Sequence, residues 1–354
     1  MDKFRIDSHK LSYHPGRVSD WIQGKLIYPI YVENSPSGSC NHRCRFCAFD
    51  FAGYQPRLLD WDRIKDRFEE MGRLGVKSIM HSGEGEPLLH RRLGEMFQVG
   101  KASGIDQAMN TNGVLFTPER ARGILPHAAW IRFSVDAGCR DTYAHLHGAK
   151  PDDFDKVLAN IAAASALKKS EGWSCTLGVQ CLLLPENRPE VRQLALLVRD
   201  AGADYLIVKP YSQHPKSITH RYDAVRYGED QELEQSLREL NTPEFNVVFR
   251  AHAMEKWDSA ERPYAACSAL AFWAHIDAGG SVWACSTYLG DERFLYGNLY
   301  ENTFQEIWEG ERRRKLLEWV RGMDPAHCRV NCRMDEVNRY LWELLNPGPH
   351  VNFI

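Results

Sequence analysis

An α/β fold built on a parallel sheet is the fold class that this sequence predicts. Apolar segments of strand length alternate with amphipathic segments of helix length from residue 28 to residue 209. Polar, glycine-containing motifs follow several of the predicted strands directly. Apolar residues make up 44% of the 354 residues, which is enough for a sizeable core. Strands that alternate with helices imply right-handed crossovers and therefore parallel pairing.

The elements follow one another in a regular order. A first strand is predicted over residues 28–32, where Pro29 is tolerated because it lies near the strand's start. The helix predicted over 60–74 carries Ile64, Phe68 and Met71 on one face. The other elements are strands over 76–81, 107–110, 130–135, 175–184 and 205–209, and helices over 93–102, 118–124, 153–168 and 190–201.

Charge and hydropathy exclude several classes of protein. The net charge is −3 and the basic residues are not clustered, which argues against a nucleic-acid partner held through phosphates. No apolar run has the length of a membrane span, and the N-terminus lacks the apolar segment of a signal peptide. We therefore expect a cytoplasmic protein with no membrane partner. Ten cysteines in such a protein indicate metal binding or catalysis rather than disulfides.

Three cysteines near the N-terminus are the most informative residues of the chain. Cys40, Cys44 and Cys47 follow the first strand with the spacing C-x3-C-x2-C, and Phe46 directly precedes the last of them. Three thiolates can hold three corners of a [4Fe–4S] cluster, which normally takes four, so that one iron stays open to a small molecule. The alternative is a zinc site, which would need a fourth Cys or His; His42 is available but lies inside the cysteine loop.

This cysteine loop resembles the signature of the radical S-adenosylmethionine (SAM) superfamily. The resemblance implies a partial (β/α)6 TIM-like barrel with its chemistry at the C-terminal ends of the strands. It also implies that SAM chelates the open iron and is cleaved to a 5′-deoxyadenosyl radical, which abstracts hydrogen from the substrate. Flavodoxin or ferredoxin would then be the electron donor.

Further motifs at the predicted strand ends match SAM-side segments of the same family. The segment 82–87 is similar to the "GGE" motif that binds the SAM amino group, with its first glycine replaced by Glu84. Segments 110–113 and 134–138 are similar to the family's "TNG" turn and "S-x-D-G" segment. The cofactor-binding residues expected from these motifs, from the cysteine loop and from the fifth strand are Phe46, Gly83, Glu84, Gly85, Glu86, Asn112, Ser134, Asp136 and Gln180.

A second cysteine set lies in the C-terminal third of the chain. Cys267 and Cys285 bracket Gly280 with the spacing C-x12-G-x4-C, and Cys328 and Cys332 follow. This pattern resembles the auxiliary-cluster domain called SPASM, in its single-cluster twitch form, and implies a second [4Fe–4S] cluster with four protein ligands. The residues between Cys267 and Cys285 are expected to form a β-hairpin that is followed by helices. A zinc site with four cysteine ligands is the alternative.

The sequence favours an enzyme that acts on a polar small molecule such as a sugar, cyclitol, aminoglycoside or nucleoside. Oxidation of a carbinol, with the auxiliary cluster as electron acceptor, is the expected chemistry. A redox-neutral epimerase and a peptide-modifying maturase are the alternatives, and an iron–sulfur scaffold without radical chemistry is a third. After the sixth strand, Tyr211, Ser212 and Gln213 are the expected substrate contacts.

Proton and hydrogen transfer would need further groups. Lys209 or His214 is the expected base for an oxidation. Cys139 or Cys181, which belong to no cluster set, would be the hydrogen donor of an epimerase, although a place in the core as a small apolar residue is the favoured interpretation of both. The predicted regions are a lead-in (1–27), the barrel (28–215), a linking segment (216–262) and the auxiliary domain (263–354).

Overall fold

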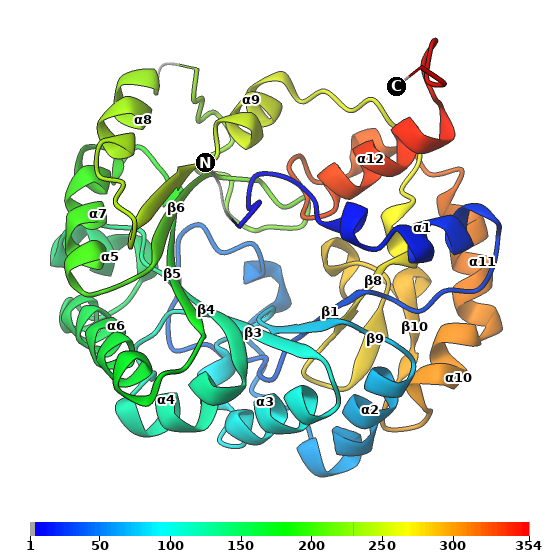
Figure 1. Ribbon diagram of the computed structural model, residues 1–354, viewed down its shortest axis with the longest axis horizontal. Coiled ribbons are helices and arrows are strands. Elements are labelled where there is room, and N and C mark those ends of the chain that lie inside the picture. Colours follow the sequence, from blue (N-terminus) through cyan, green and yellow to red (C-terminus); the bar gives the residue numbers. More distant parts are fainter. Residues whose placement is uncertain (1–3, 229, 354) are drawn as a thin grey trace.

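The computed structural model describes residues 4–228 and 230–353. Its strands form one sheet of ten, in the order β10-β9-β8-β1-β2-β3-β4-β5-β6-β7, which curls into the arc seen in Figure 1. The strands are β1 (Tyr31–Asn34), β2 (Ser78–His81), β3 (Asp106–Thr111), β4 (Ala128–Ser134), β5 (Thr176–Leu183), β6 (Tyr205–Pro210), β7 (Asn246–Phe249), β8 (Trp273–Ile276), β9 (Ser281–Trp283) and β10 (Leu295–Asn298).

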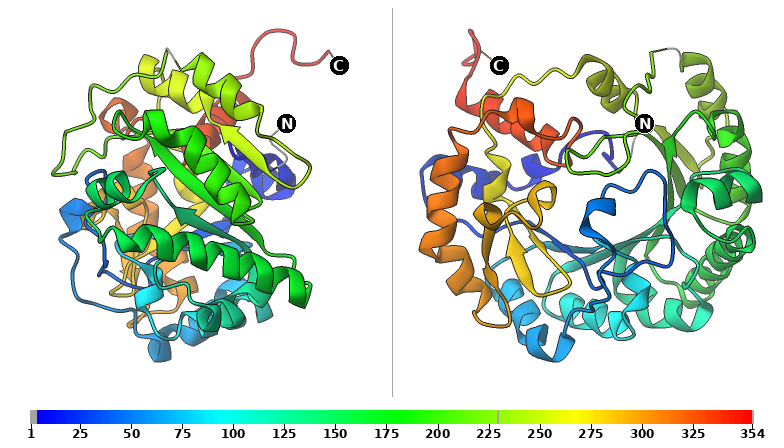
Figure 2. Two further views of the ribbon diagram at one scale, coloured as in Figure 1. Left: turned by 90° about the vertical axis from the view of Figure 1, so that its left-hand side faces the viewer. Right: turned by 180° about the vertical axis from the view of Figure 1, so that it is seen from behind.

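The helices are α1 (Pro15–Ile22), α2 (Trp61–Arg73), α3 (Leu93–Ala102), α4 (Pro118–Ile124), α5 (Arg140–His147), α6 (Asp152–Glu171), α7 (Val191–Asp200), α8 (Gln231–Arg238), α9 (Ala251–Ser259), α10 (Phe304–Glu309), α11 (Glu311–Val320) and α12 (Asp335–Leu345). Most of them cover the outside of the arc, whereas α1, α9 and α12 lie near its open side (Figures 1 and 2). None of the described helices is long and apolar enough to cross a membrane.

The predicted α/β class with a partial barrel is confirmed. Neighbouring strands from β1 to β6 pair in parallel, as crossover helices require. The C-terminal region supplies the expected hairpin, in which β8 and β9 pair antiparallel, followed by helices. The first strand begins at Tyr31 rather than at residue 28, after Pro29 and outside the positions where proline would remove a ladder donor.

The sheet extends beyond the six predicted strands at both edges. Strand β7 adds to β6 in parallel, and β8 of the C-terminal region adds to β1 in parallel. The segment 216–262, predicted as a linker, therefore contributes a strand to the barrel sheet. The boundaries between the four predicted regions themselves stay a prediction.

The inner face of the arc β1–β6, called the lumen below, is polar and accessible. On β4, Arg132 and Ser134 are half-buried, whereas Ile131 and Phe133 between them are fully buried against the helices. This alternation has the period of two that a strand requires. At the N-terminal end of the barrel, Tyr205 packs against Phe4 with ring centroids 5.1 Å apart, in a small apolar cluster that lies below Arg132.

Candidate active site

The three N-terminal cysteines lie together on the loop that follows β1. Burial raises the pKa of Cys44 well above its usual value, and the charges of Cys40 and Cys47 raise it further, so the three thiols are mutual neighbours. The side chain of Tyr54 forms a hydrogen bond with Cys47. Without a metal, three neighbouring buried thiols are costly to ionise. A bound iron–sulfur cluster removes this cost, because its iron ions bind the thiolates. The donor set therefore fits a cluster with three cysteine ligands.

Glycine at position 85 lets the loop after β2 touch the cysteine loop. A Cβ on Gly85 would lie 2.0 Å from the carbonyl oxygen of Ser39, the residue before Cys40. The backbone N–H of Glu86 donates to that same carbonyl at 2.8 Å. The glycine-rich motif thus supports the cysteine loop directly, through backbone contact that no other residue type permits.

The carboxylates of this motif are engaged by the protein. Glu86 is buried, and it accepts from the Thr111 hydroxyl at 2.6 Å and from the Asn112 N–H at 2.8 Å. Glu84 accepts from Arg57 at 2.7 Å and from the Ala278 N–H at 3.0 Å. Neither side chain is free to bind SAM, so only the backbone at these positions remains for the predicted cofactor contact.

A helix that sequence analysis omitted, α5, holds the other side of the cysteine loop. The N–H groups of Arg43 and Arg45 donate to the carbonyls of His147 and Leu146. Gly148 ends the helix in a left-handed conformation (φ +54), and a Cβ there would lie 2.4 Å from the Arg43 carbonyl. The signal was present, because Tyr143, Leu146 and His147 have helical spacing before that glycine.

His147 connects a buried carboxylate to a cluster cysteine. Its Nδ1 lies 3.5 Å from Cys44 Sγ, and its Nε2 lies 3.2 Å from the carboxylate of Asp136. Asp136 also accepts from the Leu182 N–H at 2.5 Å. The predicted strand-end carboxylate therefore orients His147 rather than facing the cofactor. Phe46 packs edge-on against the same imidazole at 5.4 Å.

Other predicted SAM-side residues lie at two places. Asn112 donates to Asn41 of the cysteine loop at 2.7 Å. Ser134 and Gln180 form a polar row across the lumen with Lys209: Lys209 Nζ donates to Gln180 Oε1 at 3.1 Å, and Gln180 Nε2 donates to Ser134 Oγ at 2.9 Å. This row of three strands is the part of the predicted site that the fold brings together in the lumen.

Gly83 has no room for a side chain, because a Cβ there would lie 1.9 Å from Ser35 Oγ. Its φ of +107 is a conformation that glycine adopts without strain. His42 lies close to Cys44 and His147, with one ligand atom from each within 4.8 Å of the others. That group omits Cys40 and Cys47, so it does not reproduce the cysteine set that the motif defines.

The structure does not support either cysteine as a hydrogen donor in the lumen. Cys181 is fully buried in the core on the helix side of β5, on the opposite face from Gln180. Cys139 precedes α5 and lies 3.3 Å from Glu190. Cys181 faces the helices because successive residues of a strand face opposite sides, and Gln180 before it faces the lumen.

The residues after β6 connect the barrel to the auxiliary cysteine loop and to the segment that follows. Ser212 accepts from Arg329 Nε at 2.8 Å, which ties it to the loop between Cys328 and Cys332. The Tyr211 hydroxyl donates to Gln213 at 2.5 Å, and Gln213 in turn donates to the Thr219 carbonyl at 2.8 Å. Their role as substrate contacts stays a prediction, and in this structure their side chains bond to the protein.

His214 is sealed as well. It is 1% exposed and stacks on Phe51 with ring centroids 4.6 Å apart. Burial lowers its pKa to about 4, helped by Arg329 and Lys216. Of the two predicted bases, only Lys209 lies in the accessible polar row.

The four C-terminal cysteines line one cavity of about 80 Å³. Burial, together with the charges of the neighbouring thiols, raises the pKa values of Cys267, Cys285 and Cys332 to about 12. Apolar side chains, including Leu270 and Trp273, form much of the wall. Four convergent thiols in a sheltered cavity fit a fully ligated cluster.

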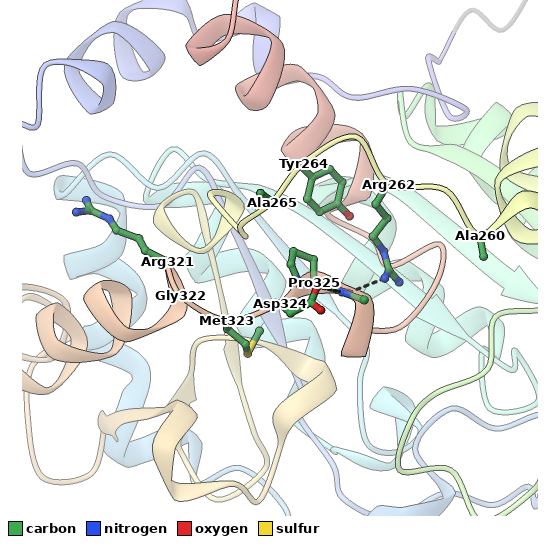
Figure 3. A pocket seen from close by; sticks show the side chains of 10 residues that line it. Ala260, Arg262, Tyr264, Ala265, Arg321, Gly322, Met323, Asp324 and Pro325 are labelled. Atoms are coloured by element: carbon green, nitrogen blue, oxygen red, sulfur yellow. Dashed lines mark hydrogen bonds between the residues drawn. The ribbon is translucent and has the colours of Figure 1, made fainter.

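Polar side chains in the wall of this cavity contact its sulfur atoms, and Arg262 outside it holds one of its loops. Asn338 donates to Cys267 Sγ at 3.5 Å, and the Tyr288 hydroxyl lies 3.4 Å from Cys328 Sγ. Arg262 donates to the carbonyls of Pro325 and Cys328, at 2.5 and 2.7 Å, beside the surface pocket of Figure 3.

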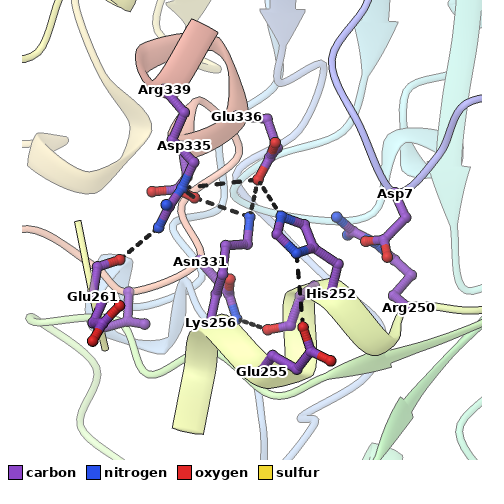
Figure 4. A network of polar contacts seen from close by, with 12 residues as sticks. Asp7, Arg250, His252, Glu255, Lys256, Glu261, Asn331, Asp335, Glu336 and Arg339 are labelled. Carbon is purple, nitrogen blue, oxygen red and sulfur yellow. Dashed lines mark hydrogen bonds and ion pairs between the residues drawn. The ribbon is translucent and has the colours of Figure 1, made fainter. Parts of the chain in front are cut away.

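Helix α12, which carries Asn338, is fastened to α9 by the ion-pair network of Figure 4. Lys256 of α9 donates to Asp335 at 2.9 Å, and the Tyr264 hydroxyl donates to the same carboxylate at 2.7 Å. The cysteine cavity is thereby linked to the segment that also supplies β7.

Comparison with protein families decides between a cluster and a zinc site. The model of the radical SAM superfamily matches residues 34–198, and that of SPASM, an iron–sulfur cluster-binding domain, matches residues 267–333. The chain belongs to the radical SAM superfamily. Its C-terminal region is a SPASM domain, so SAM, a [4Fe–4S] cluster and an auxiliary iron–sulfur centre are the cofactors, as the sequence predicted.

Relatives that match most of this radical SAM protein differ in what they make. It is 24% identical to the AdoMet-dependent heme synthase of Methanosarcina barkeri, over 86% of this chain and 87% of the relative. It is also 24% identical to mycofactocin maturase MftC of Mycolicibacterium smegmatis, over 85% and 76%. Neither of these two relatives is named for a sugar or nucleoside substrate.

Solved structures share the fold. SuiB of Streptococcus suis, bound to its precursor peptide SuiA, has a TM-score of 0.65 at 16% identity and covers 88% of this chain and 71% of SuiB. The anSMEcpe structure with AdoMet and the Cp18Cys peptide has a TM-score of 0.60 at 15% identity and covers 88% of each chain.

Proposed function

We propose that this radical SAM protein is a peptide-modifying maturase that oxidises its substrate. The support for a peptide comes from mycofactocin maturase, which matches 85% of the chain, and from similar structures solved with peptides bound. The sugar, cyclitol or nucleoside substrate that the sequence favoured is named by neither of the two relatives that match most of the chain, although the heme synthase makes a small molecule. The reaction starts from the 5′-deoxyadenosyl radical that SAM and the three-cysteine cluster supply when bound.

One observation carries the oxidation: the auxiliary cavity shares a wall with the lumen. Trp273 lines the cavity and stacks on Tyr31 of β1, with ring centroids 6.3 Å apart and an interplanar angle of 12°. Arg333 lines the same cavity and donates to the Tyr31 hydroxyl at 2.7 Å. A fully ligated cluster supplies one-electron acceptance, and here its pocket adjoins the space in which a substrate would lie.

Hydrogen bonds connect the loop after β6 to both cysteine loops. The carboxylate of Asp50, three residues after Cys47, accepts from the Ser217 hydroxyl and from the N–H of Thr219, each at 3.0 Å. Arg329 fastens the neighbouring residue Ser212 to the auxiliary cysteine loop. These contacts fix the loop after β6 between the two cysteine loops, and so limit access to the lumen from that side.

The test is a turnover assay under anaerobic conditions with reconstituted protein, SAM and a chemical reductant. A precursor peptide encoded beside the gene is compared with a library of sugars, cyclitols and nucleosides. We expect a peptide product lighter by two hydrogens, with 5′-deoxyadenosine formed in equal amount. Turnover of a library compound, with the peptide left unchanged, would refute the proposal. A product at the same oxidation level as the substrate that carries one deuterium from the solvent would indicate epimerisation instead.

A further inference from the structure

Four cationic side chains lie close enough to one another at the lumen to interact electrostatically. They are Arg132, Lys209, Arg250 and Arg333, called the lumen cation set below. Arg333 is deeply enclosed by protein, yet 42% of its side chain is solvent-accessible, which places it on an accessible internal surface.

Two members of the set are already neutralised. Arg333 forms an ion pair with Glu33 of β1, which is 1% exposed. Arg250 pairs with Asp7 at 2.9 Å, as Figure 4 shows. The charges of Arg333 and Arg250 are therefore each balanced by a carboxylate of the protein.

The other two members have no carboxylate in an ion pair within the described chain. Arg132 donates to the neutral Tyr205 hydroxyl at 3.3 Å and lies over the Trp130 ring, with its guanidinium carbon 4.6 Å from the ring centroid. Lys209 donates to the neutral amide of Gln180. The nearest carboxylate to act on Lys209, that of Asp136, is already bound by His147.

Like charges held together oppose their own ionisation. Desolvation first, and then repulsion from Arg132 and Arg250, together lower the pKa of Lys209 to about 7. A bound anion would remove that repulsion and keep Lys209 protonated. Lys209 is then a group that holds the substrate, and it is no longer a candidate for the base.

We propose that Arg132 and Lys209 bind a carboxylate of the substrate in the lumen. The proposal rests on the proposed function and names its substrate class: a peptide that presents an acidic side chain or its C-terminal carboxylate to the barrel. Arg132 presents a planar guanidinium that matches a carboxylate. Lys209, two strands away on β6 and four residues further toward the C-terminal edge of the sheet, adds a second charged donor from above.

SAM carries a carboxylate of its own, and the experiment has to separate it from that of the substrate. The protein is therefore used reconstituted and saturated with SAM, without reductant, so that no turnover occurs. The probes are glutarate, its neutral counterpart glutaramide, and inorganic phosphate. Binding is measured as the shift of the thermal unfolding midpoint with probe concentration, because a ligand that binds only the native state stabilises it.

We expect glutarate to raise the midpoint and glutaramide to leave it unchanged. The double variant Arg132→Gln/Lys209→Gln should weaken glutarate binding by about tenfold or more, since each substitution removes a charge-assisted hydrogen bond. Lys65→Gln, on the exposed face of α2, removes one charge from the outer surface and should bind glutarate like the wild type. Arg132→Lys and Lys209→Arg keep the charge and should retain most of the binding.

Three outcomes would overturn the proposal. They are wild-type glutarate binding in the double variant, stabilisation by phosphate in place of glutarate, and a loss of SAM affinity in the double variant equal to its loss of glutarate affinity. The last would assign these cations to SAM. Because no turnover is involved, glutarate binding can succeed while the peptide assay fails, and each result is read separately. In the turnover assay, a Glu→Gln substitution or C-terminal amidation of the peptide then tells which carboxylate binds.

Discussion

The two cysteine sites of this protein are built in opposite ways. The radical site takes three thiols from one loop of eight residues, whereas the auxiliary site collects four thiols from positions 267, 285, 328 and 332. A short loop brings its ligands together by covalent connection, but it leaves a coordination position open and needs outside support. A site assembled from distant segments closes its coordination shell, because each segment is fixed by the tertiary structure around it.

The supports differ accordingly. The radical loop rests on backbone contacts with Gly85 and with the end of α5. The auxiliary cavity has hydrogen bonds to its sulfur atoms from Asn338 and Tyr288, on elements that belong to the same domain. The radical site is therefore sensitive to small changes in neighbouring loops, and the auxiliary site to changes in domain packing.

Removal of the ligands separates the two sites most strongly. The triple variant Cys40→Ala/Cys44→Ala/Cys47→Ala should leave about four of about eight irons per chain and abolish 5′-deoxyadenosine formation. Replacement of Cys267, Cys285, Cys328 and Cys332 by alanine should abolish product and leave 5′-deoxyadenosine formation detectable. Iron analysis and chromatography of the nucleoside check both, and SAM cleavage by the triple variant would contradict the assignment of the radical cluster.

Gly85→Ala should damage only the radical site. The new methyl group would lie 2.0 Å from a backbone oxygen, so the cysteine loop has to move, and we expect at least a tenfold loss of SAM cleavage. Gly123→Ala is the matched control, because nothing lies within 4 Å of a Cβ at that helical position. Equal activity of the two variants would show that the contact between the loops is dispensable.

Hydrogen bonds to sulfur should tune the two clusters independently. A hydrogen bond worth about 1 kcal/mol to the reduced state corresponds to roughly 40 mV in a one-electron potential. Asn338→Ala should lower the midpoint potential of the auxiliary cluster, because it removes an amide donor to a thiolate. His147→Ala should lower that of the radical cluster, because the Asp136 N–H donates to His147 Nε2 and so favours the tautomer with its proton on Nδ1, which faces Cys44. Redox titrations followed by electron paramagnetic resonance distinguish the clusters; a shift of both in one variant would contradict independent tuning.

Replacement of the two unassigned cysteines should have the smallest effect. Cys139→Ala and Cys181→Ala should leave product formation within about twofold of wild type. Cys181→Ala should lower the free energy of unfolding by about 1 kcal/mol, since its thiol fills a buried position in the core. Loss of product with full SAM cleavage in either variant would restore that cysteine as a hydrogen donor.

The sequence determined the two cluster sites and the class of fold. Cysteine spacing identified both cluster sites because ligands of a metal must recur at fixed intervals, and the alternation of apolar segments gave the parallel sheet because each strand and helix buries one face. Helices α3 and α4 begin and end where the pattern placed them. Helix α5 could also have been found, from the helical spacing of its apolar residues.

Only the tertiary structure decided which polar residues face the lumen. Lys209 lies in the accessible row, whereas His214, five residues later, is sealed behind Phe51, and Ser212 binds Arg329 from a segment 117 residues away. Sequence proximity to a strand end cannot distinguish these cases, because burial depends on what a distant segment brings to that end. The same holds for Arg132, whose meaning as a cation without a counter-ion arises from strands that are neighbours only in the folded sheet.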